Sequence, residues 1–282
     1  MIKMAATVKI REARLCDWPG IEALARRAPF TCLPMWNWRA FLTGASCVLT
    51  EESDRICGVL FASSDESPVA WVRLAAVEDH LDIGRWLDLS LLKLLGDLQA
   101  LAVREVAWMD YGEWAGPYLS ACGFRPLVEV VTLAKAGHGA PSAAAVGVTL
   151  RAARSADLEP IVAIDRAAFK PYWWRSKATL GRRAARASEF TVAERGGRVV
   201  GYTEWELHLP VAHLNRIAVH PDEQGQGLGR LLLNDVVHAA WRSGVEELSL
   251  NTQRHNRRAR RLYDTFGFRA TGDVAKVWTL HV

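Results

Sequence analysis

The segment Gln224-Gly225-Gln226-Gly227-Leu228-Gly229 is the strongest indication of the fold in the second half of this 282-residue chain. A strand-like run ends just before it at Val219, and an apolar helical pattern begins near Leu228. Glycine lacks a Cβ atom, so several backbone N–H groups in such a turn can converge on one anion. The positive end of the following helix dipole adds to the attraction. The segment therefore predicts a phosphate-binding turn, with a plain glycine-rich loop as the alternative.

Two common phosphate-binding motifs do not fit this turn. A dinucleotide GxGxxG turn needs an acidic residue about 20 positions later, and a P-loop ends in Lys-Ser/Thr. Instead, Ile217-Ala-Val219-His-Pro221-Asp-Glu-Gln224-Gly-Gln-Gly227-Leu-Gly229 resembles the acetyl-CoA signature of the GNAT superfamily, Gln/Arg-x-x-Gly-x-Gly/Ala after a strand and a proline. A second stretch, Asn256-Arg-Arg-Ala259-Arg-Arg-Leu262-Tyr263-Asp-Thr-Phe-Gly267-Phe268, is similar to the N-x-x-A-x-x-L-Y-x-x-x-G-F segment of the same enzymes. Residues 148–282 are therefore identified, by resemblance, as an N-acetyltransferase domain.

This resemblance implies acetyl-CoA as the cofactor. The amides of residues 224–229 would hold its pyrophosphate, and the backbone edge of residues 217–219 would pair with its pantetheine arm. The residues implied in cofactor binding are Ile217, Ala218, Val219, Gln224, Gly225, Gln226, Gly227, Leu228, Gly229, Arg230, Asn256 and Tyr263. No metal site is predicted.

The resemblance also implies that Tyr263 protonates the departing thiolate. A thiol has a pKa near about 8.5 and a phenol near about 10, so a positioned tyrosine can donate a proton as charge develops on sulfur. The alternative for Tyr263 is a structural role, with its ring packed against the preceding helix.

Acyl transfer to an amine needs a base, because an alkyl ammonium ion is mostly protonated at neutral pH. The candidates on the two strands before the turn are Glu204, Glu206, His208 and His213, and we favour His213, Glu204 and Glu206. By two-residue alternation, His213 should share a face of its strand with Asn215. Ordinary strand residues are the alternative for all of them.

The chain contains an internal repeat with a long period. Residues 8–17 resemble residues 148–157, and each segment runs from a short strand into an aspartate expected to cap the next helix. Gly-Phe-Arg recurs at Gly123 and Gly267. The small-residue stretch 137–147 reads as a linker. We therefore predict domains at residues 1–136 and 148–282.

The first domain departs from the acetyl-CoA pattern. Glu78, Asp79 and Asp82 stand where the second half has its glycine-rich turn, and they would repel a pyrophosphate. Leu119 aligns with Tyr263. We expect this domain to be degenerate, keeping the fold without binding acetyl-CoA.

The order of elements predicts an α/β (α+β) fold of two tandem GNAT-like domains, each a mixed, mostly antiparallel twisted sheet flanked by helices. In the second half, helices are expected at residues 157–169, 177–187, 228–242 and 256–266. Strands are expected at residues 190–194, 199–207, 211–219 and 248–252, followed by two closing strands that end at residue 281.

Composition favours a globular, cytoplasmic protein. Half of the residues are hydrophobic and 23% are charged, with no apolar run long enough for a membrane helix and no signal-peptide core. The five cysteines are odd in number and lack CxxC spacing, which favours buried free thiols. The net charge is +4, and an arginine cluster at residues 254–261 suits an anionic cofactor better than nucleic acid.

These features predict an N-acetyltransferase that moves an acetyl group from acetyl-CoA to a primary amine. Direct attack is favoured because residues 148–282 contain no cysteine for an acyl-enzyme. The tandem layout is similar to that of mycothiol synthase, so the acceptor would be a small-molecule amine or an aminosugar conjugate. A protein N-terminus is the second choice, because residues 169–174 are similar to ribosomal-protein N-terminal acetyltransferases. The alternatives are an acyl-CoA-binding sensor and, less favoured, nucleic-acid binding; a monomer and a homodimer both fit.

Overall fold

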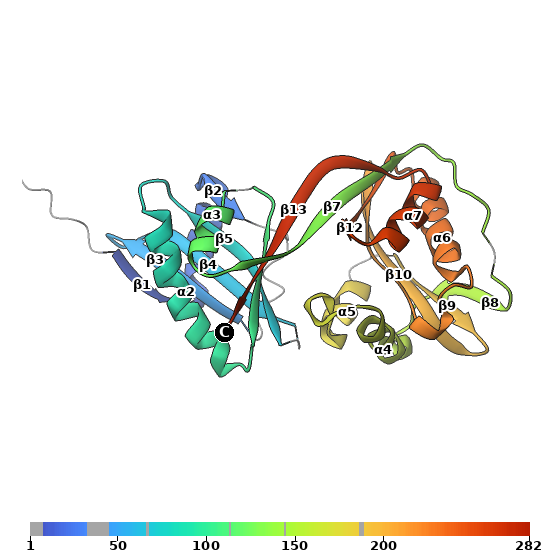
Figure 1. The fold of residues 1–282 in the computed structure, drawn as a ribbon, viewed down its shortest axis with the longest axis horizontal. Helices are drawn as coiled ribbons and strands as arrows, with labels where there is room; N and C mark the ends of the chain where they lie inside the picture. Colours follow the sequence, from blue (N-terminus) through green and yellow to red (C-terminus); the bar gives the residue numbers. More distant parts are fainter. Residues whose placement is uncertain (1–7, 33–44, 66–67, 113, 144, 186–188) are drawn as a thin grey trace, which may run out of the picture. The chain divides into compact units, whose positions relative to one another are not determined.

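The computed structural model describes residues 8–32, 45–65, 68–112, 114–143, 145–185 and 189–282 (Figure 1). These residues form two compact units. The first unit comprises Met1–Val128 together with Ala275–Val282, and the second comprises Glu129–Val274. Each unit is a mixed, mostly antiparallel sheet with helices packed against it, which confirms the predicted fold class.

The first unit has the strand order β1-β3-β4-β5-β6-β13, and β2 pairs with β5. Its paired strands are antiparallel except β5 and β6, which are parallel. Its elements are β1 (Val8–Glu12), α1 (Trp18–Arg27), β2 (Phe30–Cys32), β3 (Ala45–Glu52), β4 (Arg55–Ser64), β5 (Val69–Val77), α2 (Ile83–Ala100), β6 (Glu105–Asp110), α3 (Gly116–Ala121) and the end of β13 (Arg269–His281).

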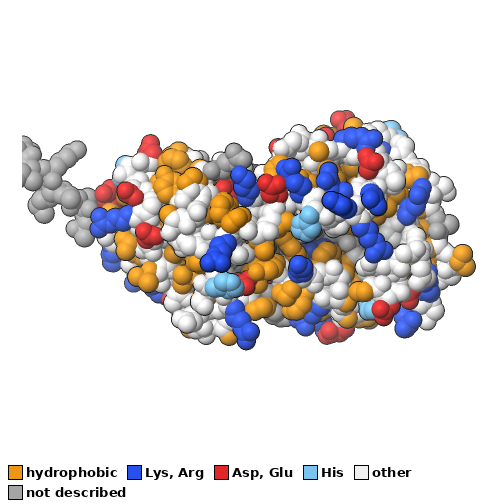
Figure 2. Space-filling model, viewed as in Figure 1, with side chains coloured by type: hydrophobic (Ala, Val, Ile, Leu, Met, Phe, Trp, Pro, Cys, Tyr) orange, Lys and Arg blue, Asp and Glu red, His pale blue; other side chains and the backbone are white. Residues whose placement is uncertain are grey.

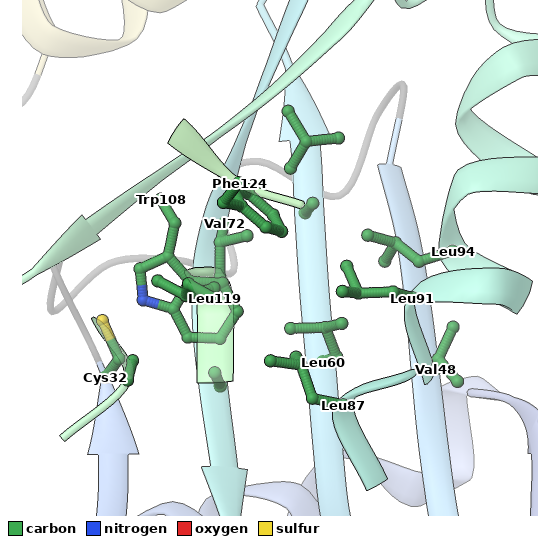
Figure 3. Close-up of a cluster of buried hydrophobic side chains, with 14 of the residues drawn as sticks. Cys32, Val48, Leu60, Val72, Leu87, Leu91, Leu94, Trp108, Leu119 and Phe124 are labelled. Atoms are coloured by element: carbon green, nitrogen blue, oxygen red, sulfur yellow. The ribbon is translucent and has the colours of Figure 1, made fainter. Parts of the chain in front are cut away.

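The alternation of side chains along β4 gives this sheet two apolar faces. Leu60 packs on the side of α2, whereas Val59 and Phe61 pack on the side of α1. Figure 3 shows the α2 side, where Leu87 and Leu91 point toward Leu60. Burial of each such side chain contributes about 1.5–3 kcal/mol.

The second unit has the strand order β7-β12-β11-β10-β9-β8, in which β11 and β12 are the parallel pair. Helices α4 and α5 pack on one face of this sheet, and α6 and α7 pack on the other (Figure 1). The elements are β7 (Arg125–Ala136), β8 (Val148–Ala152), α4 (Leu158–Ala168), α5 (Lys177–Ala184), β9 (Glu189–Arg195), β10 (Arg198–His208), β11 (Val211–Val219), α6 (Leu228–Arg242), β12 (Glu247–Gln253), α7 (Arg257–Thr265) and the start of β13.

The helices and strands predicted for the second half are confirmed with small changes of boundary, and two points differ. The second helix ends at Ala184 rather than at residue 187, and residues 186–188 lie outside the described part. The chain closes with the single strand β13 instead of two strands.

The compact units do not coincide with the domains expected at residues 1–136 and 148–282. Residues Val130–Ala136 of β7 pair with β12 in the second unit, and residues Lys276–His281 of β13 pair with β6 in the first unit. Each half of the sequence therefore supplies its last strand to the unit built mainly by the other half. Hydrophobic alternation along a strand does not specify its partner, so the sequence pattern could not show this exchange.

The repeat is visible in matching ion pairs at the start of each unit. Arg11 donates to Asp17 at 2.6 Å, and Arg151 donates to Asp157 at 2.7 Å. We expected these aspartates to cap the next helix, but neither carboxylate caps α1 or α4. Each instead accepts hydrogen bonds from its arginine and from a backbone amide before the helix, which ties the first strand to the helix start.

A buried carboxylate holds α4 against the sheet in the second unit. The side chain of Asp165 is 0% exposed. It accepts hydrogen bonds from Tyr202 of β10 at 2.5 Å and from the Nε of Arg216 of β11 at 2.8 Å. Its other oxygen accepts from the backbone N–H of Arg175 at 3.0 Å. One carboxylate thus links a helix, two strands and the loop before α5.

Asp165→Asn is expected to lower the free energy of unfolding by about 3–5 kcal/mol, because Arg216 would stay buried without its counter-charge. Urea denaturation followed by circular dichroism measures the change. The matched control is Asp264→Asn, whose ion pair with Arg269 is exposed, at 72% and 70% of the two side chains. That control should change stability by less than about 1 kcal/mol. Equal losses in both variants would contradict the importance of burial.

Candidate active site

The two parallel strands of the second unit separate partway along their length. β11 and β12 pair over Val211–Leu214 and Glu247–Leu250. β11 then continues to Val219, with β10 as its strand neighbour on the other side. Within the described residues, no strand covers the second edge of β11 beyond this point. The carbonyls of Asn215 and Val219 accept from the side chains of Arg175 and Gln224. The other backbone groups along this edge are available to an extended ligand.

A β-bulge bends β11 where the strands separate. Leu214 pairs with Trp205 and Arg216 pairs with Glu204, so Asn215 is an extra residue on β11. A bulge bends its strand and increases the local twist, which accounts for the separation from β12. The Nδ2 atom of Asn215 is buried there and has no hydrogen-bond partner within the described part of the chain.

The glycine-rich turn leads from the open edge of β11 into α6. Gly225 and Gly227 have φ angles of 85° and 83°, a left-handed conformation that other residues rarely adopt. Gly227 is the N-cap of α6 and has no side chain with which to cap it. The first amides of the helix lack partners within the helix, so they are available to an anion at the positive end of the dipole.

Side-chain contacts hold this turn in shape. The side-chain amide of Gln224 donates to the carbonyl of Val219 at 3.0 Å, and its oxygen accepts from Arg258 of α7 at 2.6 Å. The oxygen of Gln226 accepts from Arg195 of β9 at 2.6 Å. Both glutamine side chains are thus bound to neighbouring elements. The backbone N–H of Gln224 donates to the carbonyl of Pro221 at 3.2 Å, so the amides that remain for a ligand are those that follow Gln224.

A basic surface lies beside the turn. Lys and Arg side chains gather over α7 in Figure 2. The five exposed arginines on and just before this helix are Arg254, Arg257, Arg258, Arg260 and Arg261. Arg258 also reaches Gln224 of the turn, which connects this surface to the anion-binding amides.

Tyr263 lies in the apolar core on the side of the sheet that α6 and α7 cover. It is 6% exposed and belongs to the same packed cluster as Leu214 and Leu250, the last paired residues of β11 and β12. Its ring meets the edge of Phe268 at 5.9 Å between centroids. Burial raises the pKa of Tyr263 to about 12, so its phenol stays protonated at neutral pH.

Asn256 begins α7, where its side-chain oxygen accepts a hydrogen bond from the amide of Ala259 at 3.2 Å. This is a structural N-cap. A contact between Asn256 and a cofactor stays a prediction.

α7 also packs against the start of α6, since a Cβ atom at Gly229 would lie 3.5 Å from Leu262.

His213 lies on the paired part of β11, one residue before its last contact with β12. Its Nδ1 atom is 2.8 Å from the hydroxyl of Ser249 on β12. Burial lowers the pKa of His213 below its ordinary 6.5, so the imidazole is neutral at pH 7. We expected Asn215 to share a face with His213, but the bulge at Asn215 interrupts the alternation on which that expectation rests.

Glu204 is fully buried between two arginines. One oxygen pairs with Arg175, and the other accepts from Arg183 of α5 at 2.5 Å. Burial acts to raise the pKa of Glu204, but these two positive charges outweigh it and hold the pKa below its usual value. Glu206 is more exposed and accepts from Arg183 at 3.1 Å. The two glutamates therefore have different environments: Glu204 is fully engaged, whereas Glu206 is partly open.

Three residues of this site were not predicted from the sequence: Arg175, Arg183 and Ser249. Both arginines come from the segment around α5, and no local pattern links that segment to β10. Ser249 falls on the polar face of an alternating strand, so no local pattern distinguishes it from an ordinary strand residue.

The matching strands of the first unit also separate, but the chain itself fills the opening. β5 and β6 pair over Val69–Trp71 and Glu105–Ala107. Beyond this point β2 lies along β5, and Phe30–Cys32 pair with Ala75–Val77. Those β5 residues align with Ile217–Val219, so β2 takes the edge that is open in the second unit.

β2 is also bonded to the other side of the opening. The Cys32 thiol donates to the carbonyl of Met109 in β6 at 3.0 Å, and the indole of Trp114 donates to the carbonyl of Thr31 at 3.3 Å. Figure 3 shows Cys32 beside the ring of Trp108. Backbone pairing and core packing together hold β2 in place.

In the first unit, acidic side chains occupy the turn between β5 and α2. Asp82 caps α2, and its carboxylate accepts from the amide of Arg85 at 2.8 Å. A carboxylate thus takes the helix start that is open in α6. Glu78 pairs with Arg27 at 2.7 Å and with Arg55 at 2.5 Å. That the first unit does not bind acetyl-CoA stays a prediction, and the pairing of β2 with β5 and the capping of α2 by Asp82 are consistent with it.

Two features are absent from the part of the chain that the structure describes. No group of three or more His, Cys, Asp or Glu side chains is arranged to hold a metal ion. None of the described helices has the length and apolar character required to cross a membrane. Of the five free cysteines, Cys32, Cys47 and Cys57 are buried as expected, whereas Cys16 is exposed and Cys122 is half-buried.

Comparison with known proteins agrees with this geometry. The sequence profile of the Acetyltransferase (GNAT) family matches residues 158–268. The chain is 30% identical over 120 residues to the ribosomal protein bS18-alanine N-acetyltransferase of Escherichia coli (strain K12), covering 43% of this chain and 80% of that protein. It is 36% identical over 78 residues to the mycothiol acetyltransferase of Thermomonospora curvata, covering 27% of this chain and 26% of that protein.

Solved structures resemble almost the whole chain. A GCN5-related N-acetyltransferase from Sphaerobacter thermophilus has a TM-score of 0.67 at 18% identity, covering 97% of this chain and 95% of that chain. A tandem GNAT protein from the clavulanic acid biosynthesis pathway has a TM-score of 0.67 at 15% identity, covering 98% of both chains. At these identities the likeness concerns the fold alone. The chain belongs to the GNAT family of acetyltransferases, and it is an acyltransferase with a tandem GNAT fold.

Gly227→Glu is expected to weaken coenzyme A binding by about 100-fold or more, because a carboxylate at the start of α6 would repel a pyrophosphate at a cost of several kcal/mol. Calorimetric titration with coenzyme A measures the affinity. The control is Gly197→Glu in the β9–β10 hairpin, where φ is also positive and a Cβ atom meets nothing within 4 Å. Similar weakening in both variants would mean that backbone strain, rather than charge at the turn, causes the loss.

In the first unit, β2 pairs with the part of β5 that has left β6, so we predict one coenzyme A site per chain. β2 would have to leave β5 before a pantetheine arm could pair there, and Asp82 would repel the pyrophosphate. Calorimetric titration should give a stoichiometry of one, and Gly227→Glu should remove that single site. A second site that survives Gly227→Glu would show that β2 does not block the first unit.

Proposed function

We propose that this chain transfers an acetyl group from acetyl-CoA to a primary amine, and that the second unit performs the reaction. The observation that carries the proposal is the open edge of β11, which leads directly to the glycine-rich turn and the start of α6. Coenzyme A combines an extended, amide-containing arm with a pyrophosphate. The open edge suits the arm, and the helix start suits the pyrophosphate.

The residues present fit coenzyme A in three respects. The start of α6 keeps its backbone amides available, the buried Nδ2 of Asn215 offers an unused donor at the strand separation, and the arginines of α7 supply positive charge. The residues proposed to hold the cofactor are Ile217, Ala218, Val219, Gln224, Gly225, Gln226, Gly227, Leu228, Gly229, Arg230, Asn256 and Tyr263.

Acetyl-CoA supplies a thioester carbonyl that an amine nitrogen can attack. In that exchange a C–N bond forms, the C–S bond breaks, the amine loses a proton and the sulfur gains one. The second unit contains no cysteine, which favours direct attack over an acyl-enzyme. Two groups of the chain must therefore move protons, one as a base and one as an acid.

We propose His213 as the group that accepts the amine proton, directly or through water. A neutral imidazole close to the strand separation can act near pH 7. Both oxygens of Glu204 are engaged by arginines, so we assign it a positioning role for Arg175 and Arg183. Glu206, the cross-strand neighbour of His213, is the second candidate base.

Tyr263 is proposed to donate its phenolic proton to the departing thiolate. Its pKa of about 12 lies well above that of a thiol, so the proton remains in place until charge develops on sulfur. The position of Tyr263, in one cluster with Leu214 and Leu250, supports this role.

Two classes of acceptor are supported. The first is a protein N-terminus, because the chain spans 80% of the bS18-alanine enzyme with 30% identity. The second is a small amine or aminosugar conjugate, supported by 36% identity to a mycothiol acetyltransferase over a shorter stretch. A panel of alanine-initiated peptides and aminosugar amines separates the two classes.

Tyr263→Phe is expected to lower kcat by about 100-fold with little change in KM for acetyl-CoA, because the phenol is replaced by a ring of nearly the same shape. Release of coenzyme A thiol, followed with a thiol-reactive dye across the amine panel, measures the rate. Phe268→Tyr serves as the control, since it changes the neighbouring ring without removing the proposed acid.

Two results would count against these assignments. Unchanged kcat in Tyr263→Phe would remove the acid role. Tight binding of acetyl-CoA without turnover of any amine would favour an acyl-CoA-binding sensor over an enzyme that uses this site.

A further inference from the structure

Ser249 and His213 form a pair at the end of the β11–β12 ladder. They are direct partners in the parallel register, one position before the last paired residues. Their neighbours Ala212, Leu214 and Leu248 are buried on the side of α6 and α7. By alternation, the two polar side chains point to the opposite face of the sheet.

The contacts of Ser249 favour one tautomer of His213. The Ser249 hydroxyl lies 3.2 Å from the carbonyl of Ala212, a group that can only accept. A hydroxyl has one hydrogen, so when it donates to Ala212 its oxygen acts as an acceptor in the 2.8 Å contact with Nδ1 of His213. In that arrangement Nδ1 carries the proton, and the lone pair of the neutral ring lies on Nε2.

We infer that Ser249 is a positioning residue that holds His213 in the Nδ1–H tautomer, so that Nε2 is the atom that accepts the amine proton. This inference rests on the proposed function for its consequence in catalysis. The proton passes from the amine to Nε2 as the C–N bond forms, and the hydrogen bond from Nδ1 to Ser249 is kept throughout. The ring becomes an imidazolium and later returns the proton to water.

The charged groups around His213 are compatible with this arrangement. Glu206 and Glu204 face it from β10, Arg183 faces it from α5, and Arg175 faces it from the preceding loop. Glu204 is neutralised by the two arginines, and Glu206 is also bonded to Arg183. Among the described residues, the Ser249 hydroxyl forms the hydrogen bond to the ring of His213. The four charged groups act on the ring through space.

Ser249→Ala is expected to lower kcat by about 10- to 100-fold, with KM for acetyl-CoA changed less than about twofold, because the ring can then rotate or change tautomer. Ser249→Thr keeps the hydroxyl and should restore most of the rate. The control is Ser243→Ala at the end of α6, whose hydroxyl also donates to a backbone carbonyl and which lies outside the proposed machinery.

The pH profile separates positioning from a general structural role. Burial lowers the pKa of His213, so in the wild type kcat should fall only at a pH below the ordinary range of histidine titration, where His213 becomes protonated and can no longer accept a proton. Loss of the Ser249 oxygen removes an acceptor that favours the imidazolium, so the acid limb of Ser249→Ala should move to lower pH. In a His213→Ala background, Ser249→Ala should cause no further loss.

Nuclear magnetic resonance of protein labelled with ¹⁵N-histidine tests the same inference without turnover. Two-bond ¹H–¹⁵N spectra should show the Nδ1–H tautomer for His213 in the wild type and a mixture of tautomers in Ser249→Ala. An Nε2–H tautomer in the wild type, or an equal rate loss from Ser249→Ala with and without His213, would overturn the inference. Absence of turnover in every variant, with the expected spectra, would contradict the proposed function and leave the assignment of Ser249 standing.

Discussion

The separation of β11 from β12 is the constraint on which the candidate site depends. Apolar packing keeps the first half of the two strands paired, and the bulge at Asn215 directs the second half away. The bent half is then fastened from the other face of the sheet, where Arg216 is bonded to the buried Asp165 of α4 and to the carbonyl of Trp173. An unpaired strand edge is ordinarily a liability, and here the fold maintains one beside a helix N-terminus.

The two units show how one architecture can be used in two ways. Both keep a parallel pair that separates after a bulge, at Asn215 in the second unit and at Arg73 in the first. The difference lies in what meets the open edge. In the first unit a strand of the chain pairs there and Asp82 caps the helix, so polypeptide groups satisfy the backbone at both positions. In the second unit those backbone groups are available to a ligand, and a helix start with free amides has the greater affinity for an anion.

Acid–base function in the second unit depends on how buried charge is distributed. A buried carboxylate needs partners, and Glu204 has two arginines, which makes it stable as an anion and a poor proton acceptor. His213 has a hydroxyl partner, so it is oriented while its second nitrogen remains available. Tyr263 lies among apolar side chains that favour its neutral form. Glu204, His213 and Tyr263 therefore lie in three different environments: an ion-paired one, a hydrogen-bonded one and an apolar one.

The tandem repeat, the α/β class, the glycine-rich turn and the segment that contains Tyr263 could all be predicted from the amino-acid sequence. These features are local, because hydrophobic periodicity, turn glycines and helix boundaries lie in consecutive residues. The assignment of each closing strand to a unit, the pairing of β2 with β5, and the contacts of Arg175 with Glu204 and of Ser249 with His213 followed from the three-dimensional packing. These outcomes depend on contacts between residues far apart in the chain. Any strand with the right alternation can pair with several edges, so the packed fold makes the choice.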